Sequence, residues 1–311
     1  MFNKDSRICF IGDSITHAGF QIRRIYEYLR KEQKLPLKIF NCGVSGDNAT
    51  NGLLRLEETV FIHNPTDVVI AYGVNDIGIH LYDREFADDR NINERRMRIE
   101  TCVFNICSIA DRCIEKGINV IFCTPMTLDE LQGDSYSRYA GSMGALLEVS
   151  ARIRENAKKR SCKVVDYNKE SLNINAKLFK KGETIYRDDR VHPTEEGYEF
   201  MARVFLNNLG YEISIPDSLE ELKTLKELPH DNWENERYDL ERKALSDVFV
   251  RYCLFANIHD ESLIPDMCRK KLETETWDVI INELKAYETN RKIAPEYREK
   301  LYKFTENIIL N

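Results

Sequence analysis

Residues 7–16 read RICFIGDSIT, an apolar run that turns through Gly, Asp and Ser into a helical pattern. Four similar runs begin at Leu37, Asp67, Asn119 and Cys162, and they read LKIFNCGVSG, DVVIAYGVND, NVIFCTP and CKVVDYN. Each run is nearly continuous in apolar and β-favouring residues, which is typical of strands covered on both faces. The sequence therefore predicts five buried strands within the first two hundred residues.

Longer stretches with the period of amphipathic helices separate these runs, at 22–35, 53–63, 94–116 and 146–160. Strands that alternate with helices predict an open parallel sheet, with right-handed crossovers and helices on both faces. A sheet of this class gathers its functional groups at the carboxyl ends of the strands. The loops that follow the five runs are therefore where we expect a site.

The charge of the chain argues against a nucleic acid or an anionic membrane as its partner. The 311 residues include 45 Lys and Arg against 52 Asp and Glu, a net charge of −7, and no basic cluster stands out. No run approaches the roughly 18 to 20 apolar residues that span a bilayer, and the start of the chain has no signal-peptide pattern. We therefore expect a small-molecule partner, with no nucleic acid and no membrane involved.

The nine cysteines are odd in number, scattered and mostly embedded in apolar stretches. A disulfide framework usually has paired, loop-borne cysteines, so this pattern predicts reduced thiols and a cytoplasmic protein. The chain also lacks the C-x-x-C and H-x-x-x-H spacings of structural zinc sites. No metal site is expected.

Ser14 follows the first run where the strand turns into a helix. A serine at such a turn has its hydroxyl at the edge of the sheet, beside the free N–H groups of the helix start, and can act as a nucleophile. The alternative is that Asp13, Ser14 or Thr16 only caps the helix. The motif differs from the G-x-S-x-G of α/β-hydrolases, because Thr16 stands two residues after the serine.

A second polar segment, RDDRVHPT at 187–194, precedes a helix that opens with two glutamates. Asp189 and His192 are three residues apart, a spacing that lets the carboxylate orient the imidazole as a general base. Asp188 is a rival partner for the ring. A solvated loop with a surface histidine is the alternative to a catalytic role.

Two further loops carry groups that can donate hydrogen bonds to an oxyanion. Gly46 lies in NCGVSGDN after the second run, and Asn75 lies in YGVND after the third. Singly, each residue is typical of a turn or a loop cap. Together with the serine and the histidine, they end at the one sheet edge where functional groups meet, which favours a shared site.

These motifs resemble the four blocks of the SGNH hydrolases, also called the GDSL esterase/lipase family. The resemblance extends over about 7–208, with GDS at 12–14, GVSGD at 43–47, GVND at 73–76 and DRVHP at 189–193. Four motifs in the same order make it specific. It implies a flavodoxin-like, three-layer α/β/α fold with a five-stranded parallel sheet in the order 2-1-3-4-5.

The resemblance also implies a mechanism of acyl transfer without a metal or cofactor. Ser14 would be the nucleophile, His192 the general base and acid, and Asp189 the residue that orients the histidine. The implied oxyanion donors are the N–H groups of Ser14 and Gly46 and the side-chain amide of Asn75. Asp13 and Asp76 are expected to support the site.

The chain divides into a predicted catalytic domain at 1–214 and an α-helical C-terminal extension at 215–311. Apolar residues within 245–255, 277–284 and 297–308 fall on single stripes, which predicts three amphipathic helices. Those helices could pack on the catalytic body, on one another or on a second subunit. A homodimer formed through them is one expected arrangement.

Family resemblance leaves the ester open, because the family includes lipases, thioesterases, lysophospholipases and carbohydrate deacetylases. The loops at 77–93 and 126–138 mix acids with tyrosines, and Tyr82, Tyr136 or Tyr139 could lie against a sugar ring or simply pack the loops. We therefore expect an intracellular esterase acting on acetyl or other short acyl esters of a carbohydrate or similar polar molecule. The alternatives are a thioesterase or lysophospholipase, and a non-catalytic binding or scaffolding protein with a vestigial site.

Overall fold

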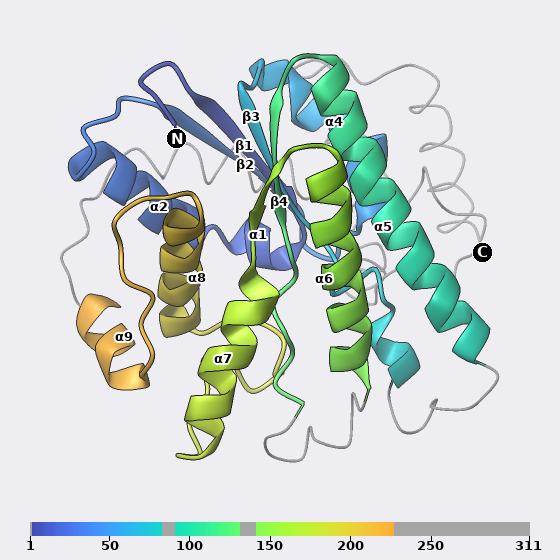
Figure 1. Ribbon diagram of the computed structural model, residues 1–311, viewed down its shortest axis with the longest axis vertical. Helices are drawn as coiled ribbons and strands as arrows, with labels where there is room; N and C mark the ends of the chain where they lie inside the picture. Colours follow the sequence, from blue (N-terminus) through green and yellow to red (C-terminus); the bar gives the residue numbers. More distant parts are fainter. Residues whose placement is uncertain (1, 83–90, 131–140, 227–311) are drawn as a thin grey trace, which may run out of the picture.

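The computed structural model describes residues 2–82, 91–130 and 141–226, which form three layers around one sheet (Figure 1). All strand pairs are parallel, and the order is β2-β1-β3-β4-β5. The predicted α/β/α architecture and its strand order are confirmed. Each strand lies within one of the five apolar runs: β1 (Arg7–Gly12), β2 (Lys38–Gly43), β3 (Asp67–Ala71), β4 (Asn119–Cys123) and β5 (Lys163–Val165).

The central strands are apolar throughout because both faces of the sheet are covered. Phe10, Val69 and Ile121 are neighbours across β1, β3 and β4, and they belong to one core. The next row, with Ile11 beside Ile70, belongs to the core on the opposite face. All five side chains are at most 3% exposed. Consecutive residues of these strands are therefore apolar on both faces of the sheet. The alternation of polar and apolar residues that marks a strand with one exposed face does not occur here.

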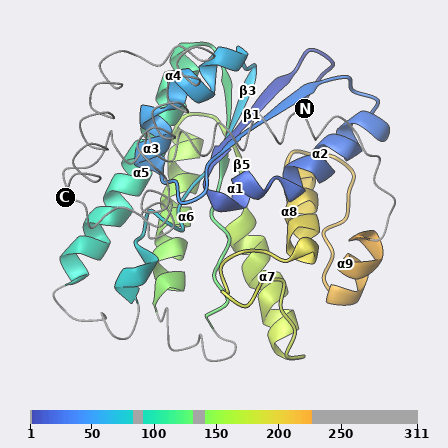
Figure 2. The same ribbon diagram turned by 180° about the vertical axis from the view of Figure 1, so that it is seen from behind.

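Helices cover both faces of the sheet, as the two opposite views show (Figures 1 and 2). Their buried faces carry the two cores, and α9 packs against α8 at the edge of its layer. On one face lie α3 (Ala49–Leu54), α4 (Leu56–Thr59), α5 (Ile92–Glu115) and α6 (Ser142–Lys159). On the other lie α2 (Phe20–Lys31), α7 (Tyr167–Phe179), α8 (Glu195–Asn208) and α9 (Leu219–Lys226).

One helical prediction differs from the structure, and one helix of the structure was not predicted. The helix expected at 53–63 is interrupted, because Arg55 leaves the helical conformation between α3 and α4 with φ −90° and ψ 8°. A separate 3₁₀ turn, Phe61–His63, follows α4. Helix α7 was not anticipated, although Asp166 caps it by accepting a hydrogen bond from the N–H of Lys169.

The predicted boundary near residue 215 falls just before α9. Leu222 of α9 is fully buried and belongs to the same core as α2 and α8, so at least the first turns after that boundary pack on the sheet domain. The three amphipathic helices predicted within 245–308 lie outside the described residues. The division at 215 and the homodimer stay predictions.

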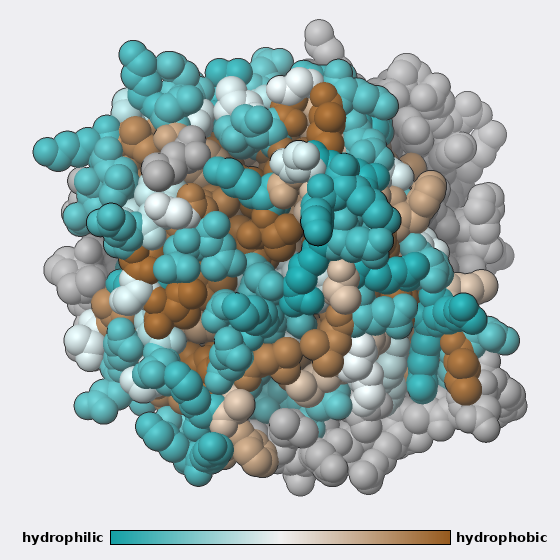
Figure 3. Space-filling view, viewed as in Figure 1, coloured by the Kyte–Doolittle hydropathy of each residue, from teal (hydrophilic) through white to brown (hydrophobic). Residues whose placement is uncertain are grey.

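One face of the described residues is mainly polar. Figure 3 shows a mostly hydrophilic face, on which hydrophobic side chains are visible in several separate places. None of the helices in the described ranges has the length and apolar character needed to cross a membrane. The seven cysteines in these ranges are free thiols, six of them buried.

Candidate active site

Polar groups from four segments meet at the carboxyl edge of the sheet. The ends of β1, β2 and β3 are joined there by backbone hydrogen bonds and side-chain contacts, and the segment that precedes α8 reaches the same place. The predicted location of the site, at the ends of the strands, follows from this topology.

Ser14 is the first residue of the short helix α1 (Ser14–Ala18), directly after β1. The carboxylate of Asp13 caps this helix by accepting the N–H of Ile15 at 3.0 Å. The turn requires glycine at position 12, because a Cβ there would lie 2.2 Å from Thr16 Oγ1 and 2.5 Å from the carbonyl oxygen of Ala71. Ser14 is left half-buried at the sheet edge, next to a helix N-terminus whose first N–H groups have no intrahelical partner.

The hydroxyl of Ser14 contacts the histidine of the fourth block. Ser14 Oγ lies 2.8 Å from His192 Nε2, and His192 Nδ1 lies 2.6 Å from Asp189 Oδ2. The ring therefore pairs with Asp189 rather than with its rival Asp188. If Nδ1 carries the proton and donates it to Asp189, then Nε2 is free to accept the proton of the serine.

The carboxylate of Asp189 forms short-range hydrogen bonds within the segment around His192. Asp189 Oδ1 accepts the N–H groups of Val191 and His192, both at 2.9 Å. Partial burial alone would raise the pKa of Asp189, but these two hydrogen bonds and the imidazole outweigh it and hold the pKa below its ordinary value. Asp189 is therefore ionised at neutral pH and can stabilise a protonated ring.

A salt bridge anchors this segment to the loop after β4. Arg190 has a positive φ of 61°, and its guanidinium lies 3.3 Å from Asp129 Oδ2. The N–H of Asp129 in turn donates to the carbonyl of Arg190 at 3.2 Å. These two contacts fix a strained turn two residues before the histidine.

Gly46 and Asn75 lie at the ends of β2 and β3. Gly46 adopts a left-handed conformation with φ 78°, and no hydrogen bond within the described ranges uses its N–H. The Asn75 amide donates one proton to the carbonyl of Asp47 at 2.8 Å. That contact leaves its second N–H available to a ligand. Both residues are half-buried, as Ser14 is.

The two acids predicted to support the site are buried and accept backbone N–H groups. Asp13 is 5% exposed and Asp76 is 8% exposed. Asp76 Oδ1 accepts the N–H of Ala49 at 2.8 Å, which connects the end of β3 to the start of α3. Burial raises the pKa of Asp13 to about 7 and that of Asp76 to about 6. Both act within the structure as helix-start acceptors.

Two residues near the site were not anticipated from the sequence. The His17 ring accepts the N–H of Ser45 at Nδ1, 3.1 Å away, and Arg55 is buried behind Asp47. His17 lies three residues after Ser14, and this spacing alone could have placed it near the site. For Arg55 no local spacing gave a signal, because three of its partners lie at or just beyond the ends of three separate strands.

Of the three tyrosines proposed to lie against a sugar ring, Tyr82 is within the described residues. Tyr82 is 5% exposed, and the Arg95 guanidinium lies 4.6 Å from the centre of its ring. Tyr82 therefore packs its loop and offers no face to a sugar. Tyr136 and Tyr139 lie outside the described residues. Within the described ranges, no group of three or more His, Cys, Asp or Glu is arranged to hold a metal ion.

The chain is similar to known acylhydrolases in sequence and in fold. Residues 10–200 match the GDSL-like Lipase/Acylhydrolase family. The chain is similar to an acetylxylan esterase from Geobacillus stearothermophilus, with 25% identity over 224 residues, 66% of this chain and 94% of that protein. A crystal structure of an acetylxylan esterase from the same organism has a TM-score of 0.56 at 22% identity, covering 68% of this chain and 96% of that one.

A second solved structure, of a gut microbial diltiazem-metabolizing enzyme, has a TM-score of 0.69 at 17% identity. It covers 99% of this chain and 94% of that one. At these identities both structural likenesses concern the fold alone.

Proposed function

The chain belongs to the GDSL-like lipase/acylhydrolase family, and from this premise we propose that it is a serine esterase for short acyl esters. The preferred acyl group is acetyl, and the alcohol is a carbohydrate or another small polar molecule. Ser14, His192 and Asp189 are the proposed catalytic residues. The proposed oxyanion donors are the N–H groups of Ser14 and Gly46 with the amide of Asn75.

One observation carries this proposal. Ser14 Oγ, the His192 ring and the Asp189 carboxylate form a continuous chain of contacts of 2.8 and 2.6 Å, although the serine and the histidine are 178 residues apart in sequence. A nucleophile, a base within hydrogen-bond reach and a group that orients the base are the three parts of acyl-transfer catalysis. A helix cap alone would not require the histidine.

In the acylation step, Ser14 Oγ attacks the ester carbonyl carbon while its proton moves to His192 Nε2. The carbonyl oxygen becomes an oxyanion, which the three N–H donors stabilise. The tetrahedral intermediate then expels the alcohol oxygen, which takes the proton from His192. The ionised Asp189 stabilises the imidazolium between these two transfers.

In the deacylation step, His192 removes a proton from water, and the resulting hydroxide attacks the carbonyl carbon of the acyl-enzyme. The same donors hold the second oxyanion. Collapse of this intermediate releases the carboxylic acid and returns the proton to Ser14. Both steps therefore use one base and one oxyanion hole, and the free enzyme is regenerated.

The choice of acyl group and alcohol is supported by the relatives. The curated relative is an acetylxylan esterase. Three solved structures of the Geobacillus enzyme are described as catalytic mutants, in which a serine, an aspartate or a histidine is replaced by alanine. These are the three residue types proposed here, and acetylated xylan is an ester of a short acyl group with the hydroxyl groups of a carbohydrate.

A fluorophosphonate probe separates an active site from a vestigial one. It phosphonylates an activated serine, so we expect labelling of the wild type and none of the Ser14→Ala variant. Ser45→Ala, which changes a neighbouring serine at the same edge, is the matched control and should still be labelled. A folded wild type that fails to label would favour the binding-protein alternative.

Acyl-chain length separates the enzymatic alternatives. Hydrolysis of p-nitrophenyl esters from two to twelve carbons should be fastest at two to four carbons, and acetylated xylo-oligosaccharides should release acetate. A maximum at eight carbons or more would instead support the thioesterase or lysophospholipase alternative. Loss of all these activities in Ser14→Ala would assign them to the proposed site.

A further inference from the structure

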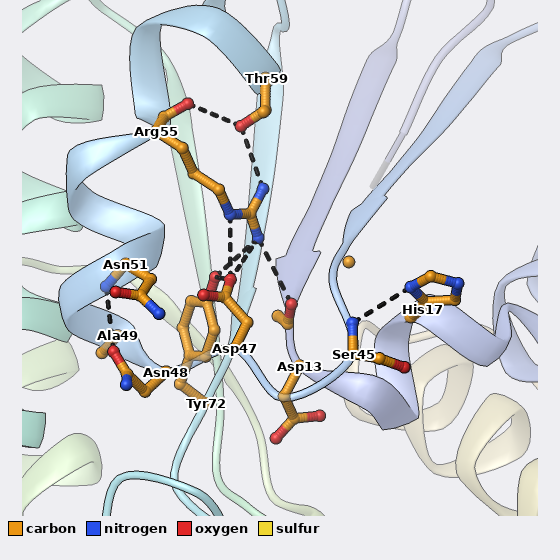
Figure 4. Close-up of polar contacts among 12 residues, drawn as sticks. Asp13, His17, Ser45, Asp47, Asn48, Ala49, Asn51, Arg55, Thr59 and Tyr72 are labelled. Carbon is orange, nitrogen blue, oxygen red and sulfur yellow. Dashed lines mark hydrogen bonds and ion pairs between the residues drawn. The ribbon is translucent and has the colours of Figure 1, made fainter. Parts of the chain in front are cut away.

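A buried guanidinium lies behind the proposed oxyanion hole. Arg55 is located at the break between α3 and α4, and its side chain and that of Asp47 are both 0% exposed. Figure 4 shows the guanidinium pointing away from its own helical segment toward Asp47 and Tyr72, with Thr59 on the opposite side. An arginine is almost never fully buried unless it is paired.

The guanidinium, Asp47 and Tyr72 are hydrogen-bonded to one another. Arg55 Nε and Nη2 donate to Asp47 Oδ2 at 2.9 and 2.6 Å, and Nη2 also lies 2.9 Å from the Tyr72 hydroxyl. That hydroxyl donates to the same carboxylate oxygen at 2.7 Å. Burial raises the pKa of Tyr72 well above its ordinary value, so the hydroxyl keeps the proton that it donates.

Three partners of Arg55 are each adjacent to one part of the proposed site. Asp47 follows Gly46, and its own carbonyl accepts the side chain of Asn75. Tyr72 stands three residues before Asn75, at the end of β3. Arg55 Nη2 also reaches the carbonyl of Gly12, 3.4 Å away and two residues before the serine.

We propose that Arg55, together with Asp47 and Tyr72, is a positioning unit that sets the relative placement of the proposed oxyanion donors. The unit joins the ends of three parallel strands from behind and touches no substrate atom. This role rests on the proposed function, since only an acyl-transfer site needs these donors in register.

A contribution to stability does not by itself explain why the chain buries this ion pair. Replacing a buried ion pair with apolar residues of similar volume is often neutral or stabilising, whereas an unpaired buried charge is strongly destabilising. The fixed planar fork of an arginine can instead hold several acceptors in a defined geometry. An oxyanion hole depends on such geometry, because donors displaced by about 1 Å can cost on the order of a hundredfold in rate.

Removing Arg55 or Asp47 outright would leave a buried charge unpaired and could unfold the protein. Tyr72→Phe is the sharper test, because it removes one hydroxyl and retains the ion pair. Thr59→Val is its matched control. It removes two hydrogen bonds on the side that faces away from the site: the one from Arg55 Nη1 to Thr59 Oγ1, 3.1 Å long, and the one from the Thr59 hydroxyl to the carbonyl of Arg55, 2.7 Å long.

Steady-state kinetics on p-nitrophenyl acetate, with thermal unfolding in parallel, distinguishes positioning from stability. We expect Tyr72→Phe to lower kcat by roughly tenfold to a hundredfold with KM changed less than twofold. Thr59→Val should keep kcat within about twofold of the wild type, even if both variants lose similar thermal stability. A trifluoromethyl ketone, whose adduct with Ser14 bears an oxyanion, should bind Tyr72→Phe more weakly by a factor like that in kcat.

A second variant tests the position of the Tyr72 hydroxyl without removing it. A Cβ at Gly52 would lie 2.3 Å from the Tyr72 hydroxyl oxygen, so Gly52→Ala should displace the ring and lower kcat as Tyr72→Phe does. Unchanged kcat for Tyr72→Phe in an active enzyme, or an equal fall for Thr59→Val, would overturn the positioning role and leave the proposed function standing. A folded wild type with no esterase activity would overturn both.

Discussion

Replacing Asp13 with asparagine should remove a pH dependence from the stability of the protein. Asp13 is 5% exposed at the turn that carries Ser14. Burial is the main cause that raises its pKa to about 7, against the hydrogen bond from Ile15, and the charges of Asp76 and Asp47 raise it further. An asparagine keeps the oxygen that accepts the N–H of Ile15 but has no proton to lose.

The sign follows from the two pKa values. In the unfolded chain an aspartate has a pKa of about 3.9, so between roughly pH 4 and 7 the unfolded state has lost a proton that the folded state keeps. The free energy of unfolding therefore falls as pH rises through this window and is level above it. Each unit of pKa shift corresponds to about 1.4 kcal/mol. The ionisation of Asp13 should therefore lower the free energy of unfolding of the wild type by roughly 2 to 3 kcal/mol between pH 5 and pH 8.

Urea unfolding at pH 5, 6, 7 and 8 measures this difference directly. The gain in stability of Asp13→Asn over the wild type should increase with pH and then level off near pH 7. Asp188→Asn, which neutralises an exposed aspartate close to the same site, should run parallel to the wild type. Curves for Asp13→Asn and the wild type that stay parallel from pH 5 to 8 would refute the reasoning.

Three further predictions concern the site. Asn75→Ala should lower kcat on an activated acetyl ester by roughly a hundredfold or more, because it removes an oxyanion donor; equal turnover in the variant would remove that assignment. Asp189→Asn should lower kcat by roughly a hundredfold to ten-thousandfold with little change in unfolding midpoint, since its side chain is 47% exposed. Gly12→Ala should destabilise by about 1 to 3 kcal/mol through the clash with Thr16, whereas Gly144→Ala, with open space around its Cβ, should not destabilise in the same urea assay.

The strands could be predicted because their burial on both faces appears in the sequence as short runs of consecutive apolar residues. Val68, Val69 and Ile70 are consecutive and all at most 1% exposed, although they face different cores. Only a strand covered on both sides produces such a run in a stretch this short. The order of the strands came from the family resemblance, since five apolar runs do not by themselves say which neighbours which.

The break at Arg55 could not be predicted from local pattern. An arginine within an amphipathic stretch usually faces solvent, and the positions around it favour a helix over 53–63. Its partner Asp47 was visible in the second block, but the hydrogen bonds around the pair also involve Tyr72, which follows β3. Burial of this side chain is therefore a property of the tertiary structure, and the backbone leaves the helical conformation at the same residue.

The spacing of Asp189 and His192 predicted their contact because both lie in one turn, where three residues bring a carboxylate to a ring nitrogen. Tyr82 shows the limit of the same approach. A tyrosine in a polar loop is equally consistent with an exposed ring and a buried one, and Arg95 covers this ring from a helix that follows later in the chain. Composition cannot separate these cases.

The two sides of the proposed site are held in different ways. His192 and Asp189 are 34% and 47% exposed, and their segment is held by short-range hydrogen bonds and by the salt bridge of Arg190 with Asp129. The oxyanion side rests on the fully buried contacts of Arg55 and Asp47, which join distant strands. Disturbing the histidine side should therefore change activity with little loss of stability, whereas disturbing the oxyanion side should change both. A site built this way has a rigid half that fixes where charge develops, and a more exposed half that moves protons.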